Sequence, residues 1–519
     1  MTAPASELIT ALLEPACYPH PVQRVELRET HGAWVLLAGD QAWKIKKPVR
    51  LPFMDFSTLA LRRAACQAEV RLNRRFETPD PATHLYLNAV PIVGPADQPR
   101  RGKPGEDDDQ AIEWAVHMRR FDEDLRLDNL CARGALKPEH LTSLAQRMAT
   151  FQAASAVAAP EGRWGRADDV LAFASDNLTT VRSGLTDARD AAQIDQLSRW
   201  TESRFSQLAP LLAQRLAEGR VREGHGDLHL ANLVLIGNEV VPFDGIEFND
   251  ALRWIDVASD MAFAWMDLLD HGQSGLANGL LSDWLDASGD TTAPDVLPFF
   301  AVYRALVRAK VAVIRSSQPG ADTTASLREA RNYTALAQRI AQPPAPQLVI
   351  THGLSGSGKT WASSCWLQSE ASGRAIRLRS DVERKRLHGL AATQASGSSL
   401  NTGLYSPQAH TDTYTHLLDR AQHLLETGWS VLVDAAFLRR HEREAFAALA
   451  QAVGCPFHIL ATDAPLAVLR QRITARQAHG ADASEATVAV LEQQLGWLEP
   501  LSDAERERCL PGQALPAAR

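Results

Sequence analysis

Residues 353–360, with the sequence GLSGSGKT, have the residue types and spacing of a loop that binds phosphate groups. An apolar run at 348–350 precedes them as a predicted strand, and helix-compatible residues follow from Trp361. Backbone N–H groups in such a loop point at phosphate oxygens, and the helix start adds partial positive charge. The predicted ATP ligands are Gly353, Ser355, Gly356, Ser357, Gly358, Lys359 and Thr360. Catalytic Lys359 is expected to reach the β- and γ-phosphates, and the Thr360 hydroxyl is expected to bind Mg²⁺.

A second group of residues combines two aspartates and an asparagine at a spacing that suits phosphoryl transfer. The sequence reads HGDLHLANLVL from residue 225 and PFDGIEF from residue 242. Asp227, in a loop, is expected to accept the proton of an attacking hydroxyl group. Asn232 and then Asp244, which follows a short strand, are expected to bind the Mg²⁺ that bridges the ATP phosphates. The alternative interpretation is a helix cap followed by ordinary turn residues.

This second string resembles the aminoglycoside phosphotransferase and choline-kinase branch of the kinase-like fold. The resemblance implies that Asp227 is the catalytic base and that Asn232 and Asp244 are metal ligands. It also implies that His225 supports the loop. Two further aspartates are expected to brace the C-lobe rather than catalyse, namely Asp256 and Asp260.

A kinase-like N-lobe also supplies a lysine on a strand and a glutamate on a helix that holds it. Lys44 and Lys46 lie two residues apart in a predicted strand and therefore share a face. We favour Lys44 as the ATP ligand because its apolar neighbours resemble the family's strand; Lys46 stays open, and either one could be a surface lysine. Glu69, in a helix predicted over 60–76, is the expected partner. The resemblance places the hinge that contacts adenine at residues 113–116.

Charged residues follow the predicted strands of the C-terminal third. Asp381 is expected to take a proton from an acceptor hydroxyl, although it could instead only cap the next helix. Arg384, one helical turn later, is expected to bind a phosphate or carboxylate of the acceptor. Asp434 ends a buried-strand run, VLVD, and is expected to order Mg²⁺. Arg472 and Arg476, four residues apart on a helix, are expected to close over ATP; the alternative is a solvated basic face.

The motifs GLSGSGKT, RSDVER and VLVDAAF together resemble the P-loop kinases related to zeta toxins, gluconate kinase and the kinase domain of polynucleotide kinases. The whole chain resembles the bacterial bifunctional aminoglycoside phosphotransferase/ATP-binding protein family, in which both domains occur in this order. The resemblance implies ATP and Mg²⁺ as cofactors at two sites.

A proline-rich segment, QPPAP at 342–346, reads as a short stiff linker. We expect a kinase-like domain at 1–340 (N-lobe about 20–118, C-lobe about 119–340), a linker at 341–347 and a P-loop kinase domain at 348–519. The expected fold class is multidomain, with a two-lobed kinase-like α+β domain before an α/β domain. Strands and helices alternate after residue 348, which predicts a parallel sheet covered by helices.

Composition limits the class of protein. The chain has 519 residues, a net charge of −8 and 45% hydrophobic residues, which is typical of a multidomain globular protein. No apolar run approaches the ~20 residues that span a bilayer, so we expect no membrane partner. The N-terminus lacks a signal-peptide pattern and the six cysteines are scattered, so we expect reduced thiols and a cytoplasmic location.

The leading hypothesis is a phosphotransferase with two Mg²⁺·ATP sites, each acting on a hydroxyl-bearing acceptor. The C-terminal acceptor would be a small molecule, a nucleotide or a polynucleotide end. One alternative is a nucleic-acid 5′-OH kinase, motivated by the basic cluster Arg374, Arg377, Arg379, Arg384, Lys385 and Arg386. Against it, the charges from residue 347 onward sum to zero, with 17 basic and 17 acidic residues. The other alternative is a regulatory module in which one ATP site does not turn over.

Overall fold

The computed structural model describes residues 3–51, 54–77, 80–318, 320–392, 394, 406–479 and 486–511. Contacts divide the chain into two compact units. The first comprises Met1–Leu136, Thr150–Phe173 and Ala209–Ala264, and the second comprises Lys137–Ala149, Ala174–Leu208 and Trp265–Arg519. The domain boundaries expected near residues 340 and 348 stay a prediction.

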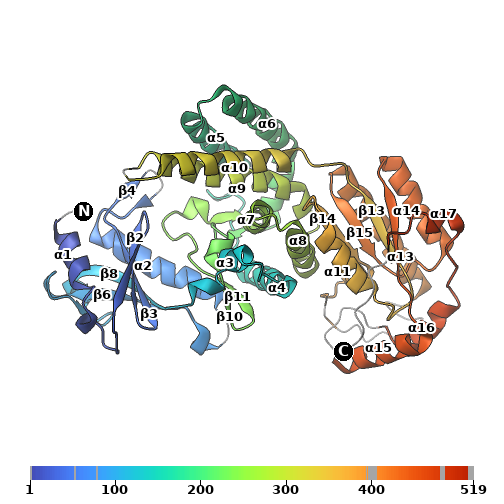
Figure 1. Ribbon diagram of the computed structural model, residues 1–519, viewed down its shortest axis with the longest axis horizontal. Helices are drawn as coiled ribbons and strands as arrows, with labels where there is room; N and C mark the ends of the chain where they lie inside the picture. The colour runs from blue at the N-terminus through green and yellow to red at the C-terminus, as the bar shows by residue number, and fades with distance from the viewer. Residues whose placement is uncertain are drawn as a thin grey trace. The chain divides into compact units, whose positions relative to one another are not determined.

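An antiparallel sheet forms the N-lobe of the first unit (Figure 1). Its strands, in spatial order, are β1 (Val25–Glu29), β2 (Ala33–Ala38), β3 (Gln41–Lys46), β8 (Ala111–Arg119), β6 (Tyr86–Val93) and β7 (Arg100–Arg101). The turn from β2 to β3 contains Gly39, whose φ of 62° is a conformation that glycine adopts at little cost. Helix α2 (Leu59–Asn73) packs on β8 and β6 through its buried face, which includes Cys66 and Val70. The strand predicted at Lys44 and Lys46 and the helix predicted over 60–76 are thereby confirmed.

The rest of the kinase-like region is mainly helical, with a short island of strands. The strands outside the large sheet are β4 (Arg50–Leu51), β5 (Met54–Asp55), β9 (Val221–Glu223), β10 (Leu233–Ile236), β11 (Glu239–Pro242) and β12 (Trp254–Asp256). The helices are α1 (Ala3–Ala11), α3 (Leu127–Ala132), α4 (Pro138–Ala154), α5 (Ala167–Gly184), α6 (Ala188–Ala217), α7 (Val257–Asp270), α8 (Ser274–Ser288), α9 (Ala293–Ser316) and α10 (Thr323–Ala341). Asn232 directly precedes β10 and Asp244 lies two residues after β11, next to the paired residues Leu233 and Pro242 of this hairpin.

The C-terminal third folds as the predicted α/β domain. A parallel sheet runs in the order β14 (Ala375–Arg379), β15 (Ser430–Asp434), β13 (Leu348–His352) and β16 (Phe457–Ala461). Helices α11 (Lys359–Ser369), α13 (Pro407–Glu426) and α14 (Arg440–Val453) cover it (Figure 1). The other helices are α12 (Ser380–Leu387), α15 (Leu466–His479), α16 (Val488–Leu495) and α17 (Asp503–Arg506). Most residues of β13, β14 and β15 are buried, because helices cover the sheet.

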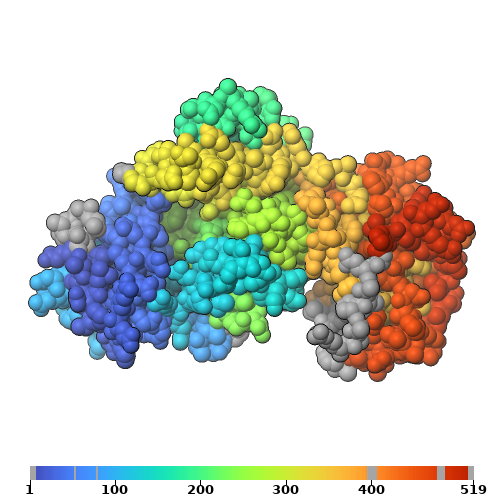
Figure 2. Space-filling view, viewed as in Figure 1, coloured from blue at the N-terminus to red at the C-terminus, as the bar shows by residue number. Residues whose placement is uncertain are grey.

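Helix α8, within the same unit, completes the edge of this sheet. The Asn278 carbonyl oxygen Oδ1 accepts a hydrogen bond from the Ala375 N–H at 2.9 Å, and Ser282 Oγ accepts one from the Arg377 N–H at 3.1 Å. Both donors belong to β14, an edge strand whose outer backbone groups need partners. Figure 2 shows the atoms of α8 lying directly against those of α11. The α8 helix therefore caps the edge of the P-loop sheet.

Among the described helices, none is both long enough and apolar enough to cross a bilayer. All six cysteines are free thiols, as expected.

Candidate functional site

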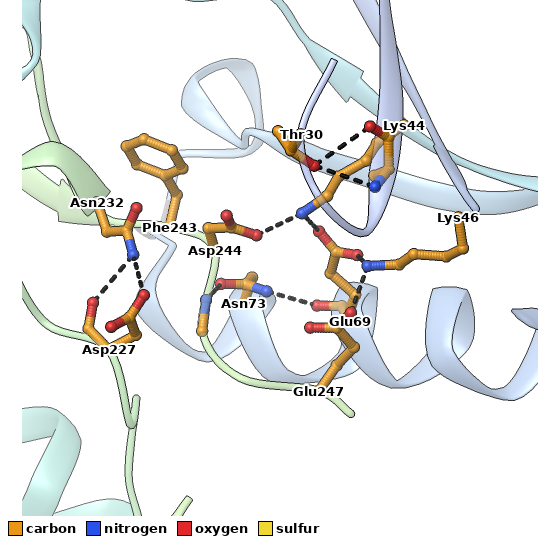
Figure 3. A network of polar contacts seen from close by, with 12 residues as sticks. Thr30, Lys44, Lys46, Glu69, Asn73, Asp227, Asn232, Phe243, Asp244 and Glu247 are labelled. Atoms are coloured by element: carbon orange, nitrogen blue, oxygen red, sulfur yellow. Dashed lines mark hydrogen bonds and ion pairs between the residues drawn. The ribbon is translucent and has the colours of Figure 1, made fainter. Parts of the chain in front are cut away.

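The two lysines of β3 meet the same glutamate (Figure 3). Lys44 Nζ lies 2.8 Å from Glu69 Oε1, and Lys46 Nζ lies 2.5 Å from Glu69 Oε2. Glu69 is fully buried on α2, so it holds both ammonium groups away from bulk water. Each lysine also contacts a second carboxylate, Asp244 for Lys44 and Glu247 for Lys46. The expected lysine–glutamate pair is present, and it is doubled.

Charge coupling in this network favours ionised lysines. Burial alone would lower the pKa of Lys44, but Asp244 and Glu69 outweigh burial and raise it well above its usual value. Burial would raise the pKa of Asp244, yet Lys44 lowers it. For Glu247, burial prevails over the attraction of Lys46 and raises the pKa. Three carboxylates face two ammonium groups here, so one negative charge is left over, and the carboxylate oxygens are the ligand type that Mg²⁺ prefers.

The loop that contains Asp227 is held by residues on both sides of it. The Asn232 amide group Nδ2 donates to Asp227 Oδ2 and to the Asp227 carbonyl, each at 3.0 Å, which leaves the amide oxygen as the end available to a metal ion (Figure 3). Asp260 accepts from the N–H groups of His225 and Gly226 at 2.8 and 2.9 Å. Asp260 therefore braces this loop, as expected. Asp256 likewise has a structural role, because it forms a buried ion pair with Arg215 at 2.7 Å.

His225 connects the Asp227 loop to the chain before Asp244. Its Nε2 lies 2.9 Å from the Phe243 carbonyl oxygen, and its Nδ1 accepts from the Asp227 N–H at 3.2 Å. These roles fit the neutral ring protonated on Nε2. Burial lowers the pKa of His225, which keeps the ring neutral. The supporting role predicted for His225 is confirmed.

N-lobe residues position Asp244. Its φ is 61°, a left-handed conformation that is uncommon for residues other than glycine. The Asp244 N–H donates to the Tyr86 hydroxyl at 3.0 Å, and the Gly245 N–H donates to Asn73 Oδ1 at 2.9 Å. Tyr86 and Asn73 thus fix the backbone that presents the carboxylate, and neither was predicted from the sequence.

The glycine-rich loop between β13 and α11 has the expected backbone. Gly353, Gly356 and Gly358 have φ values of 151°, 81° and 100°. A Cβ on Gly353 would lie 2.4 Å from the Thr462 carbonyl oxygen, so this position excludes any side chain. Lys359 Nζ donates to the carbonyls of Gly353 and Leu354, at 3.0 and 2.9 Å. The ammonium group therefore lies folded over its own loop.

Asp434 lies at the carboxyl end of β15, next to β13. It is buried, and its Oδ2 accepts from Ser363 Oγ at 3.1 Å. Ser363 lies one helical turn after Thr360 on α11, so Asp434 faces the first turn of the helix that follows the loop. This is the arrangement in which Thr360 and Asp434 could share a metal ion.

Asp381 and Arg384 form an ion pair at 3.3 Å on α12. Arg379, not Asp381, is the N-cap residue of this helix, so the interpretation of Asp381 as a helix cap is wrong. The helix follows β14, whose last residue, Arg379, pairs with Asp434 at the end of β15. Asp381 and Asp434 therefore both lie at the carboxyl-terminal end of the parallel strands.

The arginines of α15 differ in their surroundings. Arg472 Nη1 donates to the Gly356 carbonyl at 3.2 Å, so it contacts the glycine-rich loop. Arg470 pairs instead with Glu492 at 2.5 Å on the surface. The side chain of Arg476 lies outside the described part of the chain.

The comparisons with known proteins follow this geometry. The family model AAA_33, described as "AAA domain", matches residues 348–501. An uncharacterized protein of Mycobacterium tuberculosis is 30% identical over 485 residues, which is 93% of this chain and 93% of that protein. The Mycobacterium bovis relative has the same values. The chain belongs to their family.

Solved structures resemble separate parts of this family member. A choline/ethanolamine kinase family protein from Mesorhizobium loti is 13% identical, covers 66% of this chain and 95% of its own, and has a TM-score of 0.39. A sugar kinase from Janibacter is 22% identical, covers 32% of this chain and 83% of its own, and has a TM-score of 0.24.

The basic cluster after residue 373 is engaged by protein groups. Arg374 donates to the carbonyls of Ile340 and Thr427, both at 3.1 Å. Arg377 pairs with Asp283 of α8 at 3.2 Å. The remaining members contact Asp286, Asp381, Ala392 and Glu383. These ion pairs offset part of the positive charge of the cluster, and the nucleic-acid alternative stays a hypothesis.

The prediction that residues 113–116 form the hinge is wrong, because these residues lie within a strand. They lie inside β8, which pairs with β3 on one side and β6 on the other, so their backbone groups are already used. Glu113 is bound to Arg62 at 2.8 Å. The chain leaves the sheet only after Arg119.

Proposed function

We propose that each of the two sites binds Mg²⁺·ATP and transfers the γ-phosphoryl group to a hydroxyl group of an acceptor. The organisation that goes with this proposal is a kinase-like domain at 1–340, a linker at 341–347 and a P-loop kinase domain at 348–519. The observation that carries the proposal is the pair of candidate residue sets, one in each contact unit.

At the first site, the acceptor oxygen attacks the γ-phosphorus while its proton passes to Asp227. The new O–P bond forms as the bond from the γ-phosphorus to the β–γ bridging oxygen breaks, and ADP leaves. Lys44 balances charge on the phosphates, because its side chain is 14% exposed whereas that of Lys46 is 2% exposed and fully engaged. A bound Mg²⁺, held by Asn232 and Asp244, would neutralise phosphate charge.

At the second site, Asp381 accepts the proton of the acceptor hydroxyl and Arg384 binds an acidic group of the acceptor. Lys359 and the loop N–H groups hold the phosphates, and Arg472 approaches from α15. Thr360 and Asp434 would hold Mg²⁺ here. The acceptor is a hydroxyl-bearing small molecule, nucleotide or polynucleotide end.

The test uses two single-site variants and transfer of ³²P from [γ-³²P]ATP to a metabolite panel. Asp227→Ala is expected to abolish labelling at the first site and spare the second, and Lys359→Ala is expected to do the converse. If either change removed both activities, the two sites would not be independent and the proposal of two separate reactions would be wrong.

A further inference from the structure

A glutamine of α16 contacts the backbone of the glycine-rich loop. Gln494 is 9% exposed, and its Oε1 accepts a hydrogen bond from the Ser355 N–H at 2.8 Å. Ser355 lies in the middle of the loop that the sequence assigns to phosphate binding. A hydrogen bond at this point fixes the plane of the Leu354–Ser355 peptide, one residue before Gly356, where the chain enters a left-handed conformation with a φ of 81°.

The neighbouring helix α15 contacts the same stretch of loop. Arg472 donates to the Gly356 carbonyl, and a Cβ on Gly356 would lie 3.0 Å from the Leu469 carbonyl oxygen. The loop residue Leu354 packs in one apolar cluster with Leu469, Ile473 and Leu491 of the two helices. Helices α15 and α16 therefore both contact the glycine-rich loop, through hydrogen bonds to its backbone and through an apolar cluster with Leu354.

Gln494 is itself held in place by the turn that ends α16. The Trp497 N–H donates to the Gln494 carbonyl at 3.0 Å. The Trp497 ring lies 4.7 Å from the Arg439 guanidinium and 5.8 Å from the His410 ring. Because the backbone of Gln494 is anchored, its side chain can act as a fixed strut rather than as a mobile group.

We propose that Gln494 is a positioning residue of the P-loop site, which orients the Ser355 peptide so that the loop is preorganised for a polyphosphate. The inference rests on the proposed function of this site and adds a residue to it. A preorganised loop does not lose conformational entropy when ATP binds, so it binds ATP more tightly than a loop that must first become ordered. Gln494 acts through the loop backbone, and its amide oxygen is the atom that matters.

The test is calorimetric titration of the full-length chain with Mg²⁺·ATP in a Lys44→Met background, so that binding at the second site dominates. Gln494→Met keeps the length of the side chain and removes the acceptor. The matched control is Gln493→Met, the adjacent residue on the same helix. Loss of one buried hydrogen bond that leaves an N–H unpaired predicts about ten-fold weaker binding for Gln494→Met and no change for the control.

Gln494→Glu separates positioning from packing. Glutamate keeps an acceptor oxygen at the same reach but adds a negative charge near the phosphates. We expect its deficit to shrink as salt rises, because salt screens the repulsion, whereas the Gln494→Met deficit should not. Unchanged affinity in Gln494→Met, or equal and salt-independent losses in both variants, would overturn the proposal.

The failure of the parent proposal has a different signature. If the Lys44→Met chain bound no ATP, or if adding Lys359→Ala left its binding unchanged, the P-loop site itself would be misassigned. If Lys359→Ala abolished binding while Gln494→Met bound like the control, only the role of Gln494 would be wrong.

Discussion

Exchanging each β3 lysine for methionine should separate the lysine that serves ATP from the lysine that serves the fold. Lys46 contacts Glu69 and Glu247, whose side chains are 0% and 5% exposed. Lys46→Met leaves Glu247 as an uncompensated buried charge, and breaking a buried pair in this way costs about 3–5 kcal/mol. For a domain of this size each kcal/mol lowers Tm by roughly 2–4 °C, so we expect a fall of about 10 °C.

Lys44→Met should behave differently because its second partner, Asp244, is 42% exposed and can be hydrated when the lysine is gone. We expect a Tm close to that of the wild type and loss of phosphoryl transfer at the first site. The assay is thermal unfolding by circular dichroism, with [γ-³²P]ATP turnover measured on the same samples. The Lys46→Met, Glu247→Gln double variant removes both charges and should recover most of the lost stability.

The pKa of Glu247 adds a pH signature to the same experiment. Burial raises this pKa in the folded protein, so the stranded carboxyl takes up a proton as the pH falls. The destabilisation by Lys46→Met should therefore be smaller at pH 5 than at pH 8. A Lys46→Met protein that is stable but inactive, beside an active Lys44→Met protein, would refute the assignment of the two lysines.

Other substitutions test other parts of the structure. The pKa of His225 is lowered by burial, so its stabilising contribution is complete above the unfolded-state value of about 6.5 and declines below it; His225→Asn should flatten the slope of unfolding free energy against pH between 6.5 and 5, by up to about 1.4 kcal/mol per pH unit, as measured by urea denaturation. Gly353→Ala places a Cβ 2.4 Å from the Thr462 carbonyl and should abolish ATP binding at the second site by calorimetry, whereas Gly389→Ala, with a left-handed φ of 72° but no atom nearby, should not. Asn278→Leu leaves a β14 N–H unpaired and should cost about 1–3 kcal/mol, seen as a lower unfolding midpoint; an unchanged midpoint would show that α8 does not support the sheet edge.

The sequence predicted the candidate residues of both sites better than the residues that support them. Asp227, Asn232 and Asp244 were found because phosphoryl transfer restricts both their types and their spacing along one short segment. Lys44 and Lys46 could be paired with Glu69 because strand and helix periodicity define which faces meet. The choice between the two lysines could not be made from the sequence, because exposure depends on Glu247 and Asp244, which lie about 200 residues away.

Three of the residues that sequence reasoning missed act through single hydrogen bonds to backbone, and a fourth, Glu247, acts through an ion pair with Lys46. Gln494 belongs to a helix that was not predicted, and a glutamine beside Gln493 carries no pattern of its own. Tyr86 and Asn73 look like ordinary strand and helix residues, and only the fold shows that they hold the backbone at 244–245. Glu247 gave one weak signal, as the second acidic residue in the mostly apolar string PFDGIEF.

The proline-rich segment at 342–346 does not show where the partners of the P-loop sheet begin in the sequence. The segment QPPAP is a natural linker in sequence terms, and a reader of the sequence would cut the chain there. Yet β14 is an edge strand whose N–H groups are capped by Asn278 and Ser282, and Trp265 Nε1 donates to the Gly373 carbonyl at 2.9 Å. These partners precede the linker by some 60–80 residues. Because an uncapped edge strand is prone to pair with other chains, a fragment that begins after the linker should associate with itself more than the intact chain does.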